Sequence, residues 1–217
     1  AMHKPSWIPN DSVYYPLHVG ASGKSRIEGT NPDNIGDNIS DKNPYFCELT
    51  GLYWAWKNLK CDYIGLCHYR RYFSHYISPN SCIDKKKEKI FRRVDYDKLL
   101  KKYDIVLPYR YIHTKEDVKT QYIQHHHQSD LLIVKDIISK DFPDYMEAFD
   151  AVMCEHSQHL CNMFVTKKYI FDLYCEWLFS ILFKAEKFID AASYDTYQAR
   201  VFGFLSERLF DVWLYKH

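Results

Sequence analysis

The segment DYIGLCHYRRYF, residues 62–73, decides the fold. Its first seven residues, Asp62–His68, are mostly apolar and are bounded by polar residues, a pattern typical of a buried strand in a parallel sheet. Arg70 and Arg71 follow this strand closely. In such sheets, ligands bind beyond the carboxyl ends of the strands. The segment therefore indicates a central strand and, directly after it, a place for a functional site.

Strands and helices alternate on both sides of this segment. We expect three further strands at Tyr14–Val19, Tyr103–Pro108 and Cys161–Thr166. Apolar residues at helical spacing predict helices at Tyr45–Leu59, Tyr96–Lys102, Asp130–Ser139, Tyr145–Cys154, Lys168–Phe188 and Thr196–Tyr215. We expect residues 5–44 to form loops around the short strand Tyr14–Val19, and residues 75–96 to form a polar loop or a helix end. The alternation predicts a single α/β domain over residues 1–217, with a mostly parallel central sheet flanked by helices.

The bulk composition excludes several classes of protein. Apolar residues make up 47% of the 217 residues, which is enough for a sizeable core. The 29 Lys and Arg residues balance 28 Asp and Glu residues, so the charge favours neither nucleic-acid binding nor disorder. The seven cysteines form no CxxC pair, which favours reduced, buried thiols in a cytosolic protein. No signal peptide and no apolar run of about 18 residues is found.

The first five residues, AMHKP, read as the end of a strand that enters a loop. A strand that ends here has its body further upstream. We therefore expect the first strand of the domain to lie before residue 1.

Basic side chains gather just after the strand Asp62–His68. Guanidinium groups bind phosphate oxygens in a bidentate manner and stay charged, and His68 adds a donor that titrates near neutral pH. The pattern indicates an anion site formed by His68, Arg70 and Arg71. A solvated basic turn whose arginines pair with surface carboxylates would produce the same pattern, and the residues alone do not decide between the two.

A polar loop, GDNISDKNPYFCE at residues 36–48, leads into the next predicted helix. The amides of a helix N-terminus attract anions, although Asn38 and Ser40 could equally be turn and cap residues. Glu48 lies one turn inside a mainly apolar helix. It is either paired with an arginine or a candidate base with a raised pKa.

Histidines and a polar strand residue form further candidates. The adjacent histidines at 125–127 cannot all face one way, so they do not predict a metal site. His156, His159 and Cys161 resemble a zinc pattern only weakly. Asn162 opens an otherwise apolar strand and needs a partner if it is buried. That partner is a sugar hydroxyl or a neighbouring backbone group.

The last predicted helix carries both capping and charged residues. Asp195 is a plausible N-cap, with Gln198 at the capping-box position. Arg200 and Glu207 are seven residues apart and share a face. Arg208 could reach an inner carboxylate, and a buried arginine–carboxylate network is a structural alternative to catalysis.

Five motifs carry a resemblance to a known family: GDNISDKNPYFCELTGLYWAWKNL, DYIGLCHYRRYF, YDIVLP, CNMFVTKKYIFDLYCEWLF and QARVFGFLSERL. Over nearly its whole length, the chain resembles a family catalogued as a domain of unknown function, whose members occur in bacterial capsular and exopolysaccharide gene clusters. They are often labelled glycosyltransferases. The resemblance implies a GT-A-like nucleotide-sugar-binding fold and a hexosyltransferase that uses a UDP-sugar, with galactofuranose as the leading sugar. The family's usual first strand lies before His3.

The resemblance also implies roles for individual residues. Many GT-A enzymes hold a divalent metal on the donor diphosphate with an Asp-x-Asp motif, and DYIGLCHYRR contains none. We therefore expect no cofactor, and we expect basic residues to bind the diphosphate in place of a metal: His3, Lys4, His68, Arg70 and Arg71. The candidates for the catalytic base are Glu48, His126, Asp195 and Glu207. The implied sugar or nucleotide contacts are Asp37, Asn38, Asn43, Tyr45, Asn162, Gln198 and Arg200.

The implied partners are a nucleotide-sugar donor and a glycan or lipid-linked glycan acceptor, without nucleic acid. The implied location is the cytoplasm, with peripheral contact at the inner face of the cell membrane. One rival is a non-catalytic sugar- or nucleotide-binding module of a polysaccharide assembly system, which the missing Asp-x-Asp motif and the compact size favour. A second rival is a phosphate-processing enzyme that uses the Arg/His cluster, for which neither a metal site nor a nucleophile is evident.

Overall fold

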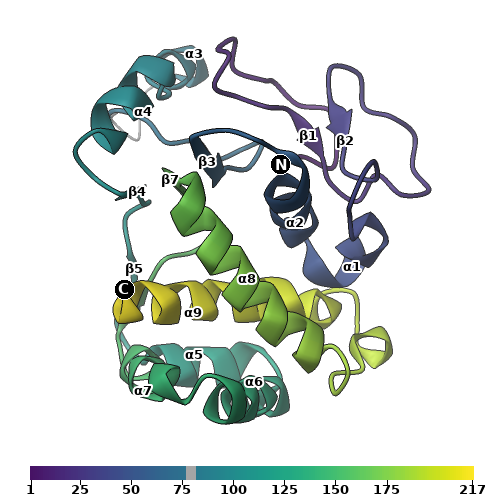
Figure 1. The fold of residues 1–217 in the computed structure, drawn as a ribbon, viewed down its shortest axis with the longest axis vertical. Helices are drawn as coiled ribbons and strands as arrows, with labels where there is room; N and C mark the ends of the chain where they lie inside the picture. Colours follow the sequence, from purple (N-terminus) through teal and green to yellow (C-terminus); the bar gives the residue numbers. More distant parts are fainter. Residues whose placement is uncertain (77–81) are drawn as a thin grey trace.

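Small sheets and a cluster of helices make up the structure, a computed structural model that describes residues 1–76 and 82–217 (Figure 1). The strands are β1 (Leu17–His18), β2 (Asn31–Pro32), β3 (Tyr63–Leu66), β4 (Ile105–Val106), β5 (Tyr111–Ile112), β6 (Ser157–Gln158) and β7 (Phe164–Lys167). The helices are α1 (Asn43–Phe46), α2 (Leu49–Asn58), α3 (Ile83–Glu88), α4 (Arg93–Leu100), α5 (Val118–His125), α6 (Gln128–Asp141), α7 (Met146–Met153), α8 (Lys168–Ala185) and α9 (Val201–Lys216). Short 3-10 helices occupy Ser40–Lys42, Pro143–Tyr145, Ala191–Ser193 and Gln198–Arg200.

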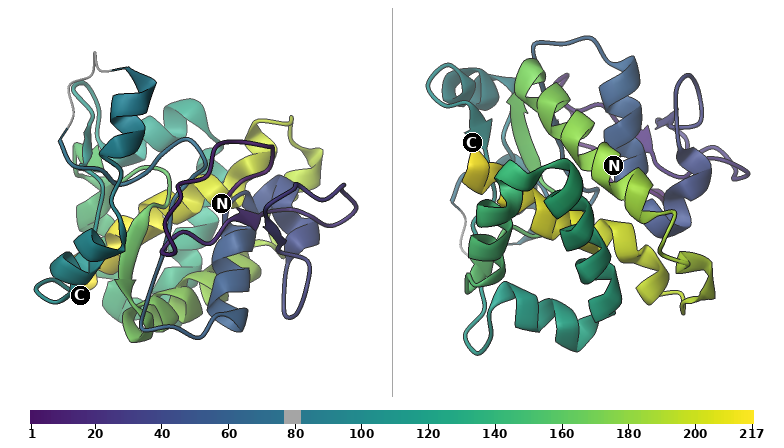
Figure 2. Two further views of the ribbon diagram at one scale, coloured as in Figure 1. Left: turned by 90° about the horizontal axis from the view of Figure 1, so that it is seen from above. Right: turned by 60° about the horizontal axis from the view of Figure 1, so that its bottom comes forward.

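Helix α8 crosses the middle of the molecule (Figure 1). It contacts β3 and β7 on one side, and α2, α6 and α9 on others. Apolar residues therefore extend around much of its circumference, and Phe171, Leu178 and Leu182 are fully buried. Helices α5, α6 and α7 gather on one side of α9, as the right-hand view in Figure 2 shows. The core thus lies between α8, α9 and the sheet.

The strands pair in three small sheets. β1 pairs with β2 in parallel, whereas β7 lies between β3 and β4 and runs antiparallel to both. β5 and β6 form an antiparallel pair. The predicted mostly parallel sheet is therefore not confirmed in the part of the chain that the structure describes. β3 and β4 do run in the same direction, because each opposes β7. Apolar patterning marks a strand as buried but carries no information about its direction.

Several predicted elements differ from the observed ones. The helix predicted over Tyr45–Leu59 breaks at Cys47, where φ is 52° and ψ is −130°. Helix α1 therefore ends at Phe46, and α2 begins at Leu49. The region read as a loop at residues 75–96 contains α3 and the start of α4, while residues 77–81 lie outside the described residues. Helix α5 was not predicted: its polar surface, with only Val118 and Tyr122 buried, hides the helical period.

The cysteines are free thiols, as predicted, but most of them are not buried. Only Cys175 is fully inside, and Cys61, Cys82 and Cys154 are exposed. An apolar neighbourhood in sequence is therefore a poor guide to burial at these positions.

One buried carboxylate fastens the first forty residues to the rest of the fold. Asp33 is fully buried and accepts hydrogen bonds from the amides of Gly20, at 2.8 Å, and Ala21, at 3.0 Å. The hydroxyls of Ser40 and Thr50 also donate to it. A buried carboxylate needs this many donors to replace lost water. Asp33 thereby joins the N-terminal loops to α2.

Replacing Asp33 is predicted to destabilise the whole protein. In Asp33→Ala, four buried donors lose their acceptor, which is expected to lower the free energy of unfolding by about 2–4 kcal/mol. Urea denaturation followed by circular dichroism measures this change. The matched control is Asp37→Ala, because Asp37 is exposed and its carboxylate accepts one hydrogen bond, from Tyr53. Equal stability of the two variants would contradict the role given to Asp33.

Candidate functional site

A cavity of about 850 Å³ opens where β3 ends. Residues 68–71, which directly follow this strand, form one wall. The junction of α1 and α2, the turn before β7, and residues 191–207 at the start of α9 form the others. Segments far apart in the sequence therefore meet at the carboxyl end of β3, an edge strand of its sheet, and α/β folds place their ligands at the carboxyl ends of strands.

Positive charge dominates one side of this cavity. Arg70, Arg71 and Arg200 all line it. Among the described residues, neither Arg70 nor Arg71 forms an ion pair with a carboxylate, and Arg70 lies 5.0 Å from the ring of Tyr69. The alternative of a basic turn paired with surface carboxylates is therefore not what the structure shows. Unpaired guanidinium groups at a cavity favour an anionic ligand.

The pKa of His3, another lining residue, reports the same excess of positive charge. Burial lowers this pKa first, and nearby positive charges lower it further. Four cationic side chains supply these charges: Lys4, Arg70, Lys24 and Arg200. An anion bound here would meet a neutral imidazole surrounded by cations.

His68 is held by the protein rather than left free as a cation. Its Nε2 atom donates to the backbone oxygen of Cys161 at 2.6 Å. Burial is the main cause that lowers the pKa of His68, which keeps the ring neutral at neutral pH. His68 therefore ties the end of β3 to the turn before β7 and leaves the positive charge to the arginines.

Glu48 is the carboxylate best placed for chemistry. It lines the cavity just before α2, and its charge acts on His68 and Arg200. The Nδ2 atom of Asn162 donates to its Oε1 atom at 2.8 Å. Within the described chain no side chain or amide occupies its Oε2 atom. One oxygen is thus fixed in place, and the other is available to a ligand.

Asn162 is the residue that fixes Glu48. It is 2% exposed, and its Oδ1 atom accepts a hydrogen bond from Ser206 at 2.9 Å. Its amide also lies 3.4 Å from the backbone oxygen of Gly203. The side chain is therefore satisfied within the protein and joins the turn before β7 to α9 and to Glu48.

Backbone strain is concentrated at the same cavity. The described non-glycine residues with a left-handed φ are Cys47 at 52°, Cys161 at 72° and Asn162 at 49°. Cys47 and Cys161 line the cavity, and Asn162 is hydrogen-bonded to Glu48, which lines it too. Such conformations cost on the order of 1–3 kcal/mol each and cluster at functional sites. Asparagine is one of the few residues that adopts this region readily.

Glu207 differs from Glu48, although both line the cavity. Its Oε1 atom accepts from the amide of Cys161 at 2.7 Å, and its Oε2 atom lies 3.1 Å from Arg208. Burial raises the pKa of Glu207, while Arg208 lowers it. Both oxygens are occupied, so Glu207 supports the turn. The sequence allowed for an arginine–carboxylate network, and this pair forms one.

The structure sets several predicted site residues apart from the cavity walls. Asp37 accepts from the hydroxyl of Tyr53, and Asn38 donates to the oxygen of Gly36 within its own loop. The ammonium of Lys4 lies 5.9 Å from the ring of Tyr69. Lys4 does not line the cavity, but its charge lowers the pKa of His3, which does.

Asp195, Gln198 and His126 form a structural group beside the cavity. Asp195 is exposed and accepts from the amides of Tyr197 and Gln198, as a cap does. The Nδ1 atom of His126 donates to Gln198 at 3.1 Å, and its ring stacks on Phe204 at 4.1 Å. These contacts hold the segment that leads into α9.

Other predicted residues do line the cavity, as do some that were not predicted. Tyr45 and Asn43 form part of the wall, although the Asn43 amide donates to the oxygen of Cys47. Cys161, which the sequence offered only in a weak zinc pattern, also lines the cavity. Lining residues that the sequence did not single out are Cys47, Tyr69, Tyr194 and Thr196. Only Tyr69 had a signal, because it lies between His68 and Arg70. Nothing in the sequence marked the others.

Metal ligands are the last feature of the site. Over residues 1–76 and 82–217, no group of three or more His, Cys, Asp or Glu side chains is arranged to hold a metal ion. The histidine run at 125–127 and the pair His156 and His159 lie within these residues, so neither takes part in such a group.

No described helix is long and apolar enough to cross a membrane.

Comparisons with known proteins found one family model and one solved structure that match the chain. The model of a family described as "Domain of unknown function (DUF4422)" matches residues 1–217. The solved apo structure of WbbM, a bifunctional glycosyltransferase, is 35% identical, with a TM-score of 0.90 over 99% of this chain. The match spans 41% of the WbbM chain. No curated protein matches.

The pKa of His126 gives a pH-dependent prediction. Burial is the main cause that lowers it, to about 4, from the 6.5 of a free histidine. Between these values the unfolded chain binds a proton that the folded chain does not, so stability falls as the pH drops from about 6.5 to about 4. His126→Gln is expected to flatten part of this slope in thermal unfolding curves. His125→Gln, at an exposed neighbour, is the control and is expected to leave the slope unchanged.

Proposed function

The chain belongs to the family described as a domain of unknown function, DUF4422, and on this premise we propose that it is a glycosyltransferase that moves a hexosyl unit from a nucleotide-sugar donor to a glycan. The likeness to WbbM over 99% of this chain supports the proposal. The observation that carries it is the cavity itself, which is lined both by arginines without a carboxylate partner in the described chain and by a carboxylate with one oxygen free of partners there. Glycosyl transfer needs both groups: cations for the leaving diphosphate and a base for the acceptor hydroxyl.

In this proposal, Arg70 and Arg71 bind the donor diphosphate, with Arg200 and the neutral ring of His3 beside them. Negative charge grows on the leaving oxygen as the glycosidic bond breaks, and fixed cations stabilise it at no cost of reorganisation. Guanidinium groups suit this role because they stay charged and bind phosphate oxygens in pairs. A GT-A type of fold and a diphosphate held without a metal are part of the proposal.

Glu48 is the proposed base. Its Oε1 atom is held by Asn162, so its Oε2 atom can accept the proton of the acceptor hydroxyl as that oxygen attacks the sugar. Glu207 is a weaker candidate because both of its oxygens already have partners. Asn162 then acts by positioning Glu48, and Tyr45 and Tyr194 offer ring surfaces for the sugar or the nucleotide base.

UDP-galactofuranose is the first donor to test, because the family resemblance implies it. The proposed acceptor is a growing capsular or exopolysaccharide, or a lipid-linked glycan. Such acceptors place the reaction in the cytoplasm, at the inner face of the cell membrane. A panel of UDP-sugars, each with and without EDTA, tests these points by calorimetry and by release of UDP.

The arginines are predicted to control donor binding. Arg70→Ala and Arg71→Ala each remove a charged hydrogen-bond donor, which is expected to lower kcat/KM for the donor roughly 10- to 100-fold. The matched control is Arg110→Ala, because Arg110 is exposed and lies outside the cavity wall. Wild-type kcat/KM in both cavity variants would refute the diphosphate role. Binding abolished by EDTA would instead show that a metal holds the diphosphate.

Glu48 is predicted to act in the transfer step and not in donor binding. Glu48→Gln keeps the shape of the side chain but removes the base, so kcat is expected to fall roughly 100- to 10,000-fold while calorimetric donor affinity is retained. Glu147→Gln, at an exposed position on α7, is the control. If wild-type protein binds a UDP-sugar but neither transfers nor hydrolyses it, the chain is the non-catalytic binding module.

A further inference from the structure

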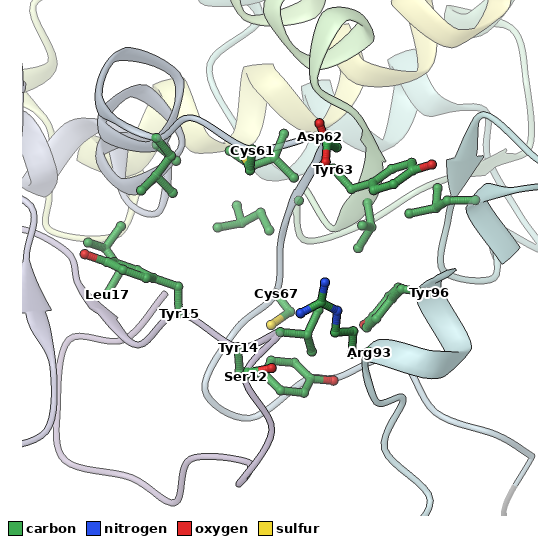
Figure 3. Close-up of a pocket in the computed structure, with 18 of the residues that line it drawn as sticks. Ser12, Tyr14, Tyr15, Leu17, Cys61, Asp62, Tyr63, Cys67, Arg93 and Tyr96 are labelled. Atoms are coloured by element: carbon green, nitrogen blue, oxygen red, sulfur yellow. The ribbon is translucent and has the colours of Figure 1, made fainter. Parts of the chain in front are cut away.

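Two cavities lie beside β3 and the residues that follow it. The smaller one, of about 470 Å³, is lined mainly by apolar side chains of α2, β1, β3 and α4, and Cys61 and Tyr96 are among its lining residues (Figure 3). Residues 191–200, part of the connection from α8 to α9, line the larger cavity but not the smaller one. The contacts that hold this segment therefore shape the larger cavity.

The side chain of Tyr194, in this segment, is tied to the start of α6. Its hydroxyl donates to the Oδ1 atom of Asp130 at 2.9 Å. Its ring lies against the imidazole of His127, with 4.3 Å between the ring centroids. Tyr194 lines the larger cavity, whereas neither Asp130 nor His127 does. Both residues therefore hold a ring of the cavity wall without lining the cavity themselves.

A second contact holds the same segment four residues later. The side-chain amide of Gln198 donates to the backbone oxygen of His125 at 2.8 Å, and its oxygen accepts from the Nδ1 atom of His126 at 3.1 Å. Gln198 does not line the cavity, but the next two residues, Ala199 and Arg200, do. The histidine run at 125–127, which is not arranged as a metal site, therefore supports one wall of the cavity.

The surroundings of Asp130 differ from those of a carboxylate that fastens the fold. Asp33 is saturated by four donors, whereas Asp130, which is 2% exposed, accepts from Tyr194 and, at 3.3 Å, from Ser129. Its Oδ2 atom has no hydrogen-bond partner in the part of the chain that the structure describes. Burying a carboxylate with so few donors is unfavourable. Asp130 therefore adds little to stability, and its main contact is with the cavity wall.

We propose that Asp130 is a positioning residue, which acts through Tyr194 to hold residues 191–200 in place and so sets where Tyr194 and Arg200 meet the donor. Asp130 itself touches no ligand in this arrangement. Its role toward the donor rests on the proposed function, whereas the contact between α6 and the wall can be tested without any ligand.

Cys47 reports whether the segment is in place. The Nε atom of Arg200, at the end of the segment, donates to its Sγ atom at 3.3 Å, and both residues line the cavity. Burial is the main cause that raises the pKa of the Cys47 thiol to about 11. Movement of the segment away from Cys47 exposes the thiol and lowers this pKa, which speeds alkylation. The loss of Arg200 opposes this change but is a smaller cause.

Three variants separate the hydrogen bond from the charge of Asp130. Asp130→Ala removes the acceptor, and Tyr194→Phe removes the donor. Asp130→Asn removes the charge but keeps an oxygen that can accept from Tyr194, so it is expected to rescue the contact. The matched control is Asp136→Ala, because Asp136 is an exposed carboxylate on the same helix.

The first measurement is alkylation by iodoacetamide, followed at each cysteine by mass spectrometry without ligand. In Asp130→Ala and Tyr194→Phe, alkylation of Cys47 is expected to be roughly tenfold faster. The rates at Cys61, in the smaller cavity, and at the buried Cys175 are expected to stay unchanged. An unchanged rate at Cys47 would overturn the proposal. Faster alkylation of Cys175 in step with Cys47 would overturn it too, because Asp130 would then serve only general stability.

The second measurement is the affinity for UDP-galactofuranose by calorimetry, together with kcat for UDP release. The same two variants are expected to raise Kd roughly tenfold and to change kcat less than about twofold, because Glu48 is untouched. The combined variant should be no weaker than either single one. Wild-type Kd in Asp130→Ala, despite faster alkylation of Cys47, would refute the positioning role. If wild-type protein binds no UDP-sugar, the proposed function fails and the role toward the donor fails with it, while Cys47 still decides whether α6 holds the wall.

Discussion

The side chain of Asn162 joins parts of the site that lie far apart in the sequence. It donates to Glu48, 114 residues away, and accepts from Ser206 of α9. Its left-handed backbone forms the turn that brings the Cys161 amide to Glu207 and the Cys161 oxygen to His68. An amide side chain can both donate and accept, which no carboxylate or hydrocarbon of this size does at neutral pH. The geometry of both glutamates therefore depends on this buried residue.

The two glutamates show how one cavity gives two carboxylates different roles. Glu207 is bound at both oxygens, by a backbone amide and by the buried Arg208, so neither oxygen is left without a partner in the protein. Glu48 is bound at one oxygen and open at the other within the described chain. Environments that separate two nearby carboxylates in this way are how enzymes divide acid–base and structural tasks. The arginines are divided similarly, since Arg208 is committed to Glu207 while Arg70 and Arg71 have no carboxylate partner among the described residues.

The sequence singled out charged residues that the structure brings to one cavity, but it did not identify most of the cavity's walls. Arg70 and Arg71 were identified because charged residues directly after an apolar strand lie where α/β folds bind their ligands, and Glu48 because a carboxylate is unusual inside an apolar helix. Cys47 and Tyr194 carried no such signal. Cys47 lies in the wall because of its strained φ, and Tyr194 because of the path of its loop. Both features depend on tertiary contacts. Asp37 and Asn38 share the polar composition of a binding loop, yet their partners are local. The long apolar period of α8 was predicted almost to its ends, whereas the largely polar α5 was not.

The antiparallel course of β7 is what brings the site together. In the observed register Leu66, at the end of β3, lies opposite Phe164, at the start of β7. The turn that precedes β7 therefore lies beside the segment that follows β3, and His68 can reach Cys161. In a wholly parallel sheet the start of β7 would lie at the opposite end of the sheet, and Asn162 could not hold Glu48 in the cavity that Arg70 and Arg71 also line. Apolar patterning indicated a site at the end of β3 but could not predict the direction of β7. The cavity depends on that direction.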